Sequence, residues 1–226
     1  MTLSISIIIP VYNEADTIAT TLEQLIPYPG EEILVVDGGS KDQTREIVAA
    51  FPARLLSSPA GRGVQLHQGA LAARGEILLF LHADTLLPRD WTTHVDQILA
   101  RPRTAAGAFR LGIDSRKKGF RLIELGANLR SHLRQKPYGD QALFMLRETY
   151  FQAGGFPDWP LMEDVALVRQ LRKIGRIRLA RARVTTSARR WERLGLVRTT
   201  LRNQLIQAAS LMGVSPGRLA RWYYSS

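Results

Sequence analysis

Three acidic positions combine the residue type and the placement that group-transfer chemistry needs. Asp37 and Asp84 each follow an apolar run of strand length, and Glu163 and Asp164 stand at the start of an expected helix. A carboxylate can hold a divalent cation against a phosphate or take a proton from a hydroxyl. Because the carboxyl ends of parallel strands meet at one crevice, we expect Asp37, Asp84 and Asp164 to share a pocket.

Each of these acids also has a purely structural interpretation. Asp and Thr are ordinary turn residues, so Asp84 could simply form the turn before Pro88. Negative charge is stabilised at a helix N-terminus, so Glu163 and Asp164 could be plain first-turn acids. Successive helical residues point about 100° apart, and only one of these two can therefore face the crevice. The shared placement of the three acids favours function.

The elements that must position these acids alternate along the first part of the chain. Apolar strands are predicted at 4–11, 31–36 and 77–81, with a shorter one at 54–57. Helical spacing, caps and breakers predict helices at 18–26, from the Ser40 cap to about 51, and at 61–74. This order predicts an α/β fold: a doubly wound, mostly parallel sheet flanked by helices. After Asp84 we predict strands at 105–113, 142–146 and 177–186 and helices at 92–100, 120–133 and 194–212.

Charge divides the chain more clearly than composition does. The 226 residues suit one domain at 1–191 with a basic helical extension at 192–226. The formal net charge is +11, and residues 165–226 hold 14 basic side chains against one acidic. Such a field favours an anionic partner: a diphosphate, a nucleic acid or an acidic lipid surface. The apolar stripe Leu201, Leu205, Ala208 and Met212 could lie on anionic lipid or pack on the core.

Several classes of protein are excluded. The chain has no cysteine, which removes disulfides and thiolate chemistry. The segment after the first strand lacks the glycines of a dinucleotide site, Gly61-Arg62-Gly63 lacks the third glycine, and there is no P-loop. The apolar opening at 5–11 is too short for a signal peptide or a membrane span, so we expect a cytoplasmic protein.

Five ordered motifs carry a resemblance to a known family. They are Ile-Ile-Ile-Pro-Val-Tyr-Asn-Glu at 7–14, Val-Val-Asp-Gly-Gly-Ser at 35–40, the glycine-bearing helix start at 61–69, His-Ala-Asp at 82–84 and Glu-Asp at 163–164. In this order they resemble family-two glycosyltransferases of the GT-A fold, over roughly residues 4 to 191. With His-Ala-Asp-Thr and a late Arg-Arg-Trp at 189–191, the chain is similar to a short, soluble bacterial branch of that family.

The resemblance implies roles for the donor side of the site. Asp37 would accept a hydrogen bond from the base, for which uracil is expected, and Asp84 would bind Mg²⁺ or Mn²⁺ on the diphosphate as the last Asp of the family's Asp-x-Asp. His82 replaces the first Asp of that motif, which weakens any assignment of a ribose or metal contact there. The donor-binding residues implied are Pro10, Tyr12, Glu14, Asp37, Arg62, Ala83 and Asp84.

For the acceptor side, the resemblance implies that Asp164 is the general base, with Glu163 beside it. Gly139, Asp140 and Gln141 lie where family members contact acceptor or donor sugar, and Arg190 and Trp191 match part of an acceptor motif whose Gln is missing here. A strand edge with one packed indole is the structural alternative for the latter pair.

The resemblance thus implies an inverting, metal-dependent, hexosyltransferase-like enzyme. It would move a sugar from a nucleotide-diphosphate donor, with UDP expected, to an acceptor hydroxyl of unknown identity. A lipid acceptor and a peripheral position at the inner face of the cell membrane are hypotheses. Two rivals stay open: a nucleotidyltransferase, which should show a glycine-rich loop after the first strand, and a non-catalytic nucleic-acid binder, which should show a stacking platform or groove-reading helix. We expect no nucleic-acid partner.

Overall fold

A computed structural model describes residues 3–26 and 30–224, apart from the side chains of residues 190, 193, 211 and 224. The strands are β1 (Ile5–Val11), β2 (Glu32–Asp37), β3 (Arg54–Ser57), β4 (Ile77–Phe80), β5 (Thr85–Leu86), β6 (Thr104–Asp114), β7 (Phe144–Leu146) and β8 (Arg176–Ser187). The helices are α1 (Ile18–Leu25), α2 (Thr44–Ala49), α3 (Arg62–Ala72), α4 (Trp91–Leu99), α5 (Lys118–Arg134), the short 3₁₀ turn η1 (Gly139–Gln141), α6 (Arg147–Gln152), α7 (Glu163–Ile174), α8 (Arg189–Leu194), α9 (Leu196–Leu211) and α10 (Pro216–Tyr224).

One mixed sheet runs through the molecule in the order β3-β2-β1-β4-β7-β6-β8-β5. The first four strands are parallel, with Val11 of β1 opposite Asp37 of β2. Strand β7 is antiparallel to both β4 and β6, and β6 and β8 are again parallel. The predicted doubly wound, mostly parallel sheet flanked by helices is confirmed.

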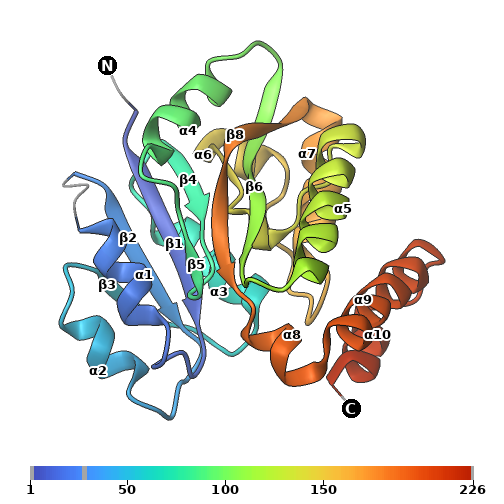
Figure 1. The fold of residues 1–226 in the computed structure, drawn as a ribbon. Coiled ribbons are helices and arrows are strands. Elements are labelled where there is room, and N and C mark those ends of the chain that lie inside the picture. The colour runs from blue at the N-terminus through green and yellow to red at the C-terminus, as the bar shows by residue number, and fades with distance from the viewer. Residues whose placement is uncertain (1–2, 27–29, 225–226) are drawn as a thin grey trace.

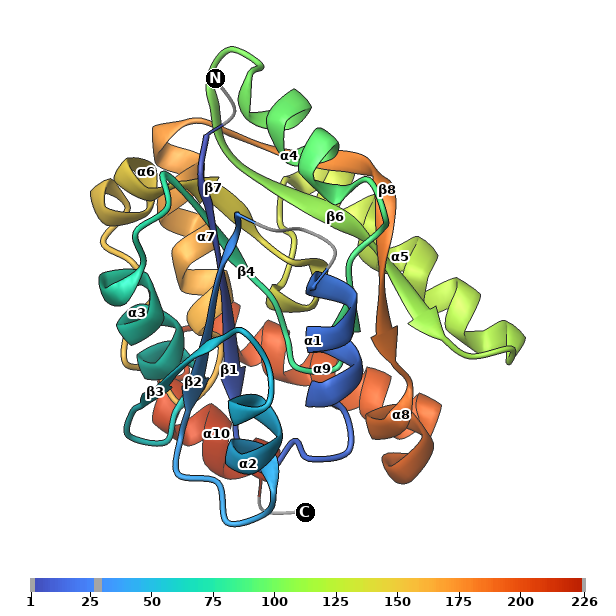
Figure 2. The same cartoon turned by 90° about the vertical axis from the view of Figure 1, so that its left-hand side faces the viewer.

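Alternation along the central strands divides the core into two layers. Ile5, Ile7 and Ile9 of β1 point to the layer covered by α1, α2 and α4, whereas Ile8 points to the layer covered by α3, α6 and α7. Figure 2 shows these two groups of helices on opposite sides of the sheet. The four β4 residues are completely or almost completely buried, and each such side chain stabilises the fold by about 1.5–3 kcal/mol. Strand β4 is thus fixed at the centre of the sheet, and it ends four residues before Asp84.

The helix predicted at 194–212 is present as α9, whereas α8 before it and α10 after it were not predicted. The chain turns at Gly195, where φ is +85°, and this turn separates α8 from α9. Helices α9 and α10 pack on each other and on Leu161 through Ile206, Ala209, Leu219 and Ala220. Figure 1 shows α5, α9 and α10 on the side of the molecule away from β2 and β3. Among the described residues, no helix combines the length and hydropathy that crossing a bilayer requires.

Candidate active site

Asp84 lies in the turn that follows β4, where the amide of Thr85 donates to the carbonyl of His82 over 3.2 Å. Strand β5 begins immediately afterwards and pairs with β8 at the far edge of the sheet. Burial raises the pKa of Asp84, the nearby Glu14 raises it further, and Arg189 opposes the shift. Asp84 is therefore a carboxylate at the rim whose charge calls for a cationic partner.

Asp164 occupies the first turn of α7 with its carboxylate fixed in orientation. Its Oδ2 accepts a hydrogen bond of 2.8 Å from the amide of Gly139, and its Oδ1 accepts one of 2.8 Å from the amide of Val165. Met162, just before the helix, has the left-handed φ of +67° that turns the chain into α7. The side chain is held by the backbone, which suits a group that must meet a substrate in one orientation.

Glu163 points elsewhere, as the helical geometry requires. Its carboxylate is 2% exposed and accepts a hydrogen bond from Nε of Arg62, at the first position of α3. Gly63 allows this contact, because a methyl group at that position would come within 2.4 Å of the carbonyl of Pro157. Of the two adjacent acids, Asp164 faces the pocket and Glu163 ties α7 to α3.

A pocket of about 220 Å³ brings several predicted residues together. Gly139 separates His82 from Asp164: a methyl group there would lie 3.1 Å from Nε2 of His82 and 3.5 Å from Oδ2 of Asp164. Burial, followed by repulsion from Arg62, lowers the pKa of His82 to about 3, so the imidazole is neutral. The ionisable and aromatic residues that line the pocket are Arg62, His82, Asp84, Tyr138, Asp140, Asp164, Trp191 and Tyr223.

Asp140 is the least satisfied of these groups. Its Oδ1 is buried and has no hydrogen-bond partner among the described residues. Burial raises the pKa of Asp140 to about 6, and Arg130 opposes this shift while Asp164 adds to it. A buried acceptor without a donor costs about 1–3 kcal/mol. Asp140 is therefore ready to accept a hydrogen bond from a ligand in the pocket.

The late Arg-Arg-Trp segment folds back over the start of the chain. Nη2 of Arg189 donates to Oε2 of Glu14 over 2.7 Å, across 175 positions of sequence. The Trp191 ring packs edge-on against Phe120 of α5, with the ring centroids 6.1 Å apart. Arg189 was not among the predicted site residues, and only the fold brings it near Asp84. The side chain of Arg190 lies outside the described residues.

Asp37 lies at the carboxyl end of β2, as predicted, but its carboxylate does not reach the solvent. It is completely buried, and Oδ2 accepts 3.0 Å and 3.2 Å hydrogen bonds from Nη1 of Arg45 and the amide of Gly39. Burial alone would raise the pKa of Asp37, but hydrogen bonds from Ser40, Arg45 and Gly39 hold that pKa below its usual range. The pocket that contains Asp84 and Asp164 therefore does not include Asp37.

The other residues predicted to bind the sugar donor or the acceptor differ in solvent exposure. Tyr12 is half exposed at the end of β1, beside Pro10. Ala83 is buried, and its carbonyl accepts a 2.7 Å hydrogen bond from Oγ1 of Thr21. Gln141 is completely buried, with its side chain bonded to Ser131 and the carbonyl of Phe109. Gln141, the last residue of η1, thus holds this turn against α5 and β6 through its side-chain hydrogen bonds.

Residues of the C-terminal helices complete the pocket and were not predicted to do so. Asn203, Ile206 and Gln207 of α9 and Tyr223 of α10 form one wall. The Tyr223 hydroxyl donates to Oδ1 of Asn203 over 3.2 Å. Spacing along the sequence gave no signal for these side chains, since the expected helix at 194–212 was interpreted only as lying on anionic lipid or packing on the core.

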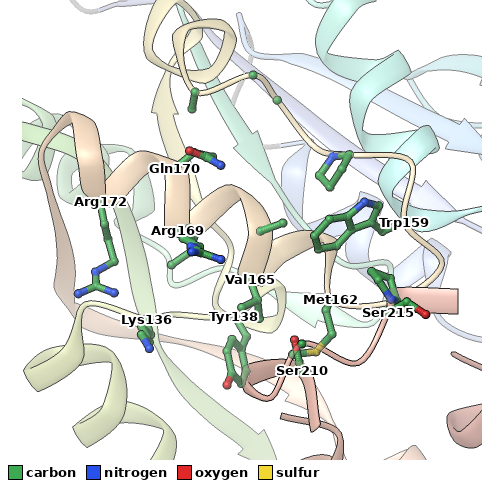
Figure 3. Close-up of a pocket in the computed structure, with 18 of the residues that line it drawn as sticks. Lys136, Tyr138, Trp159, Met162, Val165, Arg169, Gln170, Arg172, Ser210 and Ser215 are labelled. Carbon is green, nitrogen blue, oxygen red and sulfur yellow. The ribbon is translucent and has the colours of Figure 1, made fainter. Parts of the chain in front are cut away.

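A second, larger cavity of about 740 Å³ adjoins the first and shares Tyr138, Met162 and Val165 with it. It lies between α7 and the turn that joins α9 to α10. Figure 3 shows Arg172 and Lys136 on one side of this cavity and Trp159 on the other. The two cavities together place a small polar pocket next to a wider chamber lined by basic and aromatic side chains.

With this geometry in place, comparison with known proteins identifies the family. Residues 6–155, more than half of the chain, match the family described as Glycosyl transferase family 2. The chain belongs to glycosyl transferase family 2. It is therefore an enzyme of that glycosyltransferase family, as its motifs implied.

Curated relatives of this glycosyltransferase align with it only in part. A dolichyl-phosphate beta-glucosyltransferase of Trichomonas vaginalis is 35% identical over 97 residues, which are 35% of this chain and 30% of the relative. A glucosyl-3-phosphoglycerate synthase of Mycolicibacterium paratuberculosis is 30% identical over 97 residues, which are 38% and 30% of the two chains. The matched part thus spans about a third of the length of these relatives.

Solved structures share the fold over most of this glycosyltransferase. S. aureus TarS in complex with UDP-GlcNAc covers 82% of this chain and 58% of its own, with a TM-score of 0.62 and 19% identity. Glucosyl-3-phosphoglycerate synthase from Mycobacterium tuberculosis in complex with Mn²⁺, UDP and glucosyl-3-phosphoglycerate covers 82% and 70%, with a TM-score of 0.57 and 22% identity. The expected GT-A-like fold is confirmed.

Proposed function

We propose that this glycosyltransferase moves a sugar from a UDP-sugar to an acceptor hydroxyl with inversion at the anomeric carbon. The observation that carries the proposal is that Asp84 and Asp164, separated by 80 positions, line one pocket at the carboxyl end of β4. In a single displacement, one carboxylate can hold a divalent ion on the leaving diphosphate, and the other can take the proton of the incoming hydroxyl.

In this proposal Asp164 is the general base. Its carboxylate takes the proton of the acceptor hydroxyl as that oxygen bonds to the anomeric carbon, and the bond from this carbon to the diphosphate oxygen breaks on the opposite side. A single displacement of this kind inverts the configuration. The two backbone amides that hold Asp164 fix the direction of the proton transfer. A positioned base of this kind typically contributes about 10² to 10⁴ in rate.

The residues present fit a divalent ion that arrives with the donor. Among the described residues, no group of three or more His, Asp or Glu side chains stands ready to hold an ion alone. Mg²⁺ typically needs only one or two carboxylates when phosphate oxygens complete its shell, and Asp84 is a partly buried carboxylate that lines the pocket. When bound, such an ion would neutralise charge on the departing diphosphate. The Arg189 guanidinium, near Asp84, adds positive charge from the protein itself.

The donor base would lie over the carboxyl ends of β1 and β2. The exposed ring of Tyr12 offers a stacking surface there, and Pro10 shapes the end of β1. Asp37 fixes the backbone of Gly39 and Ser40 beside it. A base that reaches Asp37 would replace the contact from Arg45, whose side chain is 44% exposed.

The acceptor would enter from the opposite side, past η1, Trp191 and the C-terminal helices. Gly139 and Asp140 border this side, and the free Oδ1 of Asp140 can accept a hydrogen bond from a sugar or acceptor hydroxyl. The larger basic chamber beyond Tyr138 leaves room for the rest of the acceptor. An acceptor with a lipid part is compatible with this arrangement, because the outer wall is built by partly apolar helices.

Calorimetric titration with UDP, GDP, CDP and TDP, with and without Mn²⁺, tests the proposal. We expect UDP to bind best, and Mn²⁺ to strengthen its binding at least about tenfold, which corresponds to about 1.4 kcal/mol. Asp84→Asn should remove the Mn²⁺ effect, and Asp158→Asn, an exposed loop acid, should keep it. If none of the four diphosphates binds to a folded protein, a nucleotide-dependent transferase is ruled out.

A further inference from the structure

Helix α5 presents an apolar stripe to solvent. Leu122, Leu125, Leu129 and Leu133 follow helical spacing and are 53% to 73% exposed. The opposite face, with Phe120, Glu124, Ala127 and Ser131, is buried. Isolated exposed leucines are ordinary, but four in one row along 17 residues form a continuous surface.

Helix α9 presents a second stripe of the same kind. Val197, Leu201, Leu205 and, just after the helix, Met212 are 59% to 77% exposed. The core-facing side of α9 is already occupied, since Ile206 and Ala209 pack on Leu161 and Leu219. The interpretation of this stripe as a core contact is therefore wrong: Leu201, Leu205 and Met212 do not pack on the core.

The two stripes belong to neighbouring helices. Residues of α5 and α9 are in contact, and a methyl group on Gly119 of α5 would come within 2.9 Å of Leu196 of α9. Phe120 and Leu196 also share one apolar cluster. Figure 1 shows both helices on the same side of the molecule. We call the exposed apolar side chains of α5 and α9 together the α5–α9 face.

Positive charge surrounds the α5–α9 face. Exposed basic side chains beside it are Lys117, Lys118, Arg121, Arg134 and Arg198. Helices α5 and α8–α10 contain only two acids, and both are paired, Glu124 with Arg121 and Glu192 with Lys117. A surface with leucines at its centre and cations around it matches the interface of a bilayer with anionic headgroups.

We propose that the α5–α9 face docks this protein on an anionic lipid surface, with both helices lying in the headgroup plane. A second copy of the chain would bring the same cations face to face, and like charges would oppose that pairing. An anionic bilayer instead gains about 1 kcal/mol for each nearby Lys or Arg, in addition to the burial of apolar side chains. The charge pattern therefore selects the membrane over self-association.

Docking on this face would place the pocket next to the lipid. Phe120, on the buried side of α5, contacts Trp191, and Trp191 lines the pocket with Asp84 and Asp164. A hydroxyl carried on a lipid could thus reach Asp164 without leaving the membrane; this last step rests on the proposed function.

Vesicle sedimentation tests the docking itself and needs no sugar donor. The wild-type protein should sediment with phosphatidylcholine vesicles that contain phosphatidylglycerol, and at least about tenfold less with pure phosphatidylcholine. Raising the salt concentration should weaken the binding, since salt screens exposed charge. The double substitution Leu125→Glu with Leu129→Glu should lower binding at least about tenfold. Leu71→Glu, at an exposed leucine of α3, is the matched control and should bind as the wild type does.

Several results would overturn the proposal. Wild-type protein that stays in the supernatant with anionic vesicles would do so, as would equal loss of binding in Leu71→Glu. Sedimentation velocity should show a monomer in the absence of lipid, and a dimer that the double substitution dissociates would assign the face to a second copy instead. Circular dichroism melting verifies that each variant is folded. Donor binding by calorimetry is measured separately, so failure of docking leaves the transferase proposal standing.

Discussion

At the scale of single residues, Asp164 is the group with the clearest chemical role. We predict that Asp164→Asn lowers kcat by about 10² to 10⁴, because an amide cannot take the acceptor proton. The KM for the donor should change little, since Asp164 faces the acceptor side and Asn can still accept from the amide of Gly139. Steady-state kinetics with the best UDP-sugar measure both quantities. Asp158→Asn is the control, and a fully active Asp164→Asn enzyme would remove Asp164 from the mechanism.

Asp140 should make stability depend on pH. Its pKa is raised to about 6 in the folded protein, above the value of about 3.9 for an unfolded chain. The folded state therefore keeps this proton to a higher pH than the unfolded state does. The resulting contribution to the free energy of unfolding is fully present below pH about 4 and is lost as the pH rises through about 6. Asp140→Asn cannot ionise. Its free energy of unfolding relative to the wild type should therefore rise by roughly 2 to 3 kcal/mol between these limits.

Urea unfolding of wild type and Asp140→Asn from pH 4 to pH 8 measures this difference. The exposed Asp158→Asn should show no such trend. A difference in unfolding free energy that stays constant with pH would contradict a raised pKa at Asp140.

The residues of the candidate site were partly predictable from the sequence. Asp84 and Asp164 could be found because each follows a strong local signal, a buried strand or a helix start. The closure of Asp37 by Arg45 could not be found, since the same Asp-Gly-Gly-Ser turn fits an open or an occupied carboxylate. Arg189 belongs to the late Arg-Arg-Trp motif, but only tertiary packing shows its contact with Glu14, and no pattern in the sequence indicates the position of Tyr223.

At the scale of elements, α3 positions Arg62 by packing tightly on the sheet. Gly69 of α3 allows this approach, because a methyl group there would come within 2.4 Å of Cγ2 of Ile8 and 3.0 Å of Cγ2 of Val36. We predict that Gly69→Ala lowers the free energy of unfolding by about 1–3 kcal/mol through overpacking. Gly126→Ala in α5, where nothing lies within 4 Å, should instead be neutral or stabilise by up to about 1 kcal/mol. Denaturant unfolding of both variants gives the comparison, and equal effects would refute tight packing at Gly69.

Elements with their own periodicity were predicted well, and short ones were not. The strands and helices up to β4 were expected because apolar runs alternate with helical spacing. Strand β5 was missed because two residues carry no period; it exists through pairing with β8 and the 3.0 Å bond between the Thr85 and Thr186 hydroxyls. Helix α8 was missed because its six residues carry no clear apolar period before the turn at Gly195.

At the scale of the whole molecule, the C-terminal helices support the segment that carries Asp164, the proposed general base. Leu219 of α10 is completely buried against Leu161 and its neighbours, and Met162, two residues before Asp164, packs on the same cluster. We predict that Leu219→Ala leaves a cavity that costs about 2–5 kcal/mol locally and loosens residues 161–165. Hydrogen exchange at these amides should become faster, while Leu205→Ala, at an exposed position of α9, should leave it unchanged. Unaltered exchange in a folded Leu219→Ala protein would show that the two regions are independent.

The ion pair between Glu14 and Arg189 has a consequence for how the protein is made. Glu14 leaves the ribosome well before its partner, which is synthesised 175 residues later. The contact that Arg189 makes with Glu14, beside Asp84, can form only after the whole sheet has been synthesised. A nascent chain that has not yet reached Arg189 therefore lacks the ion pair that joins Glu14 to the end of the sheet.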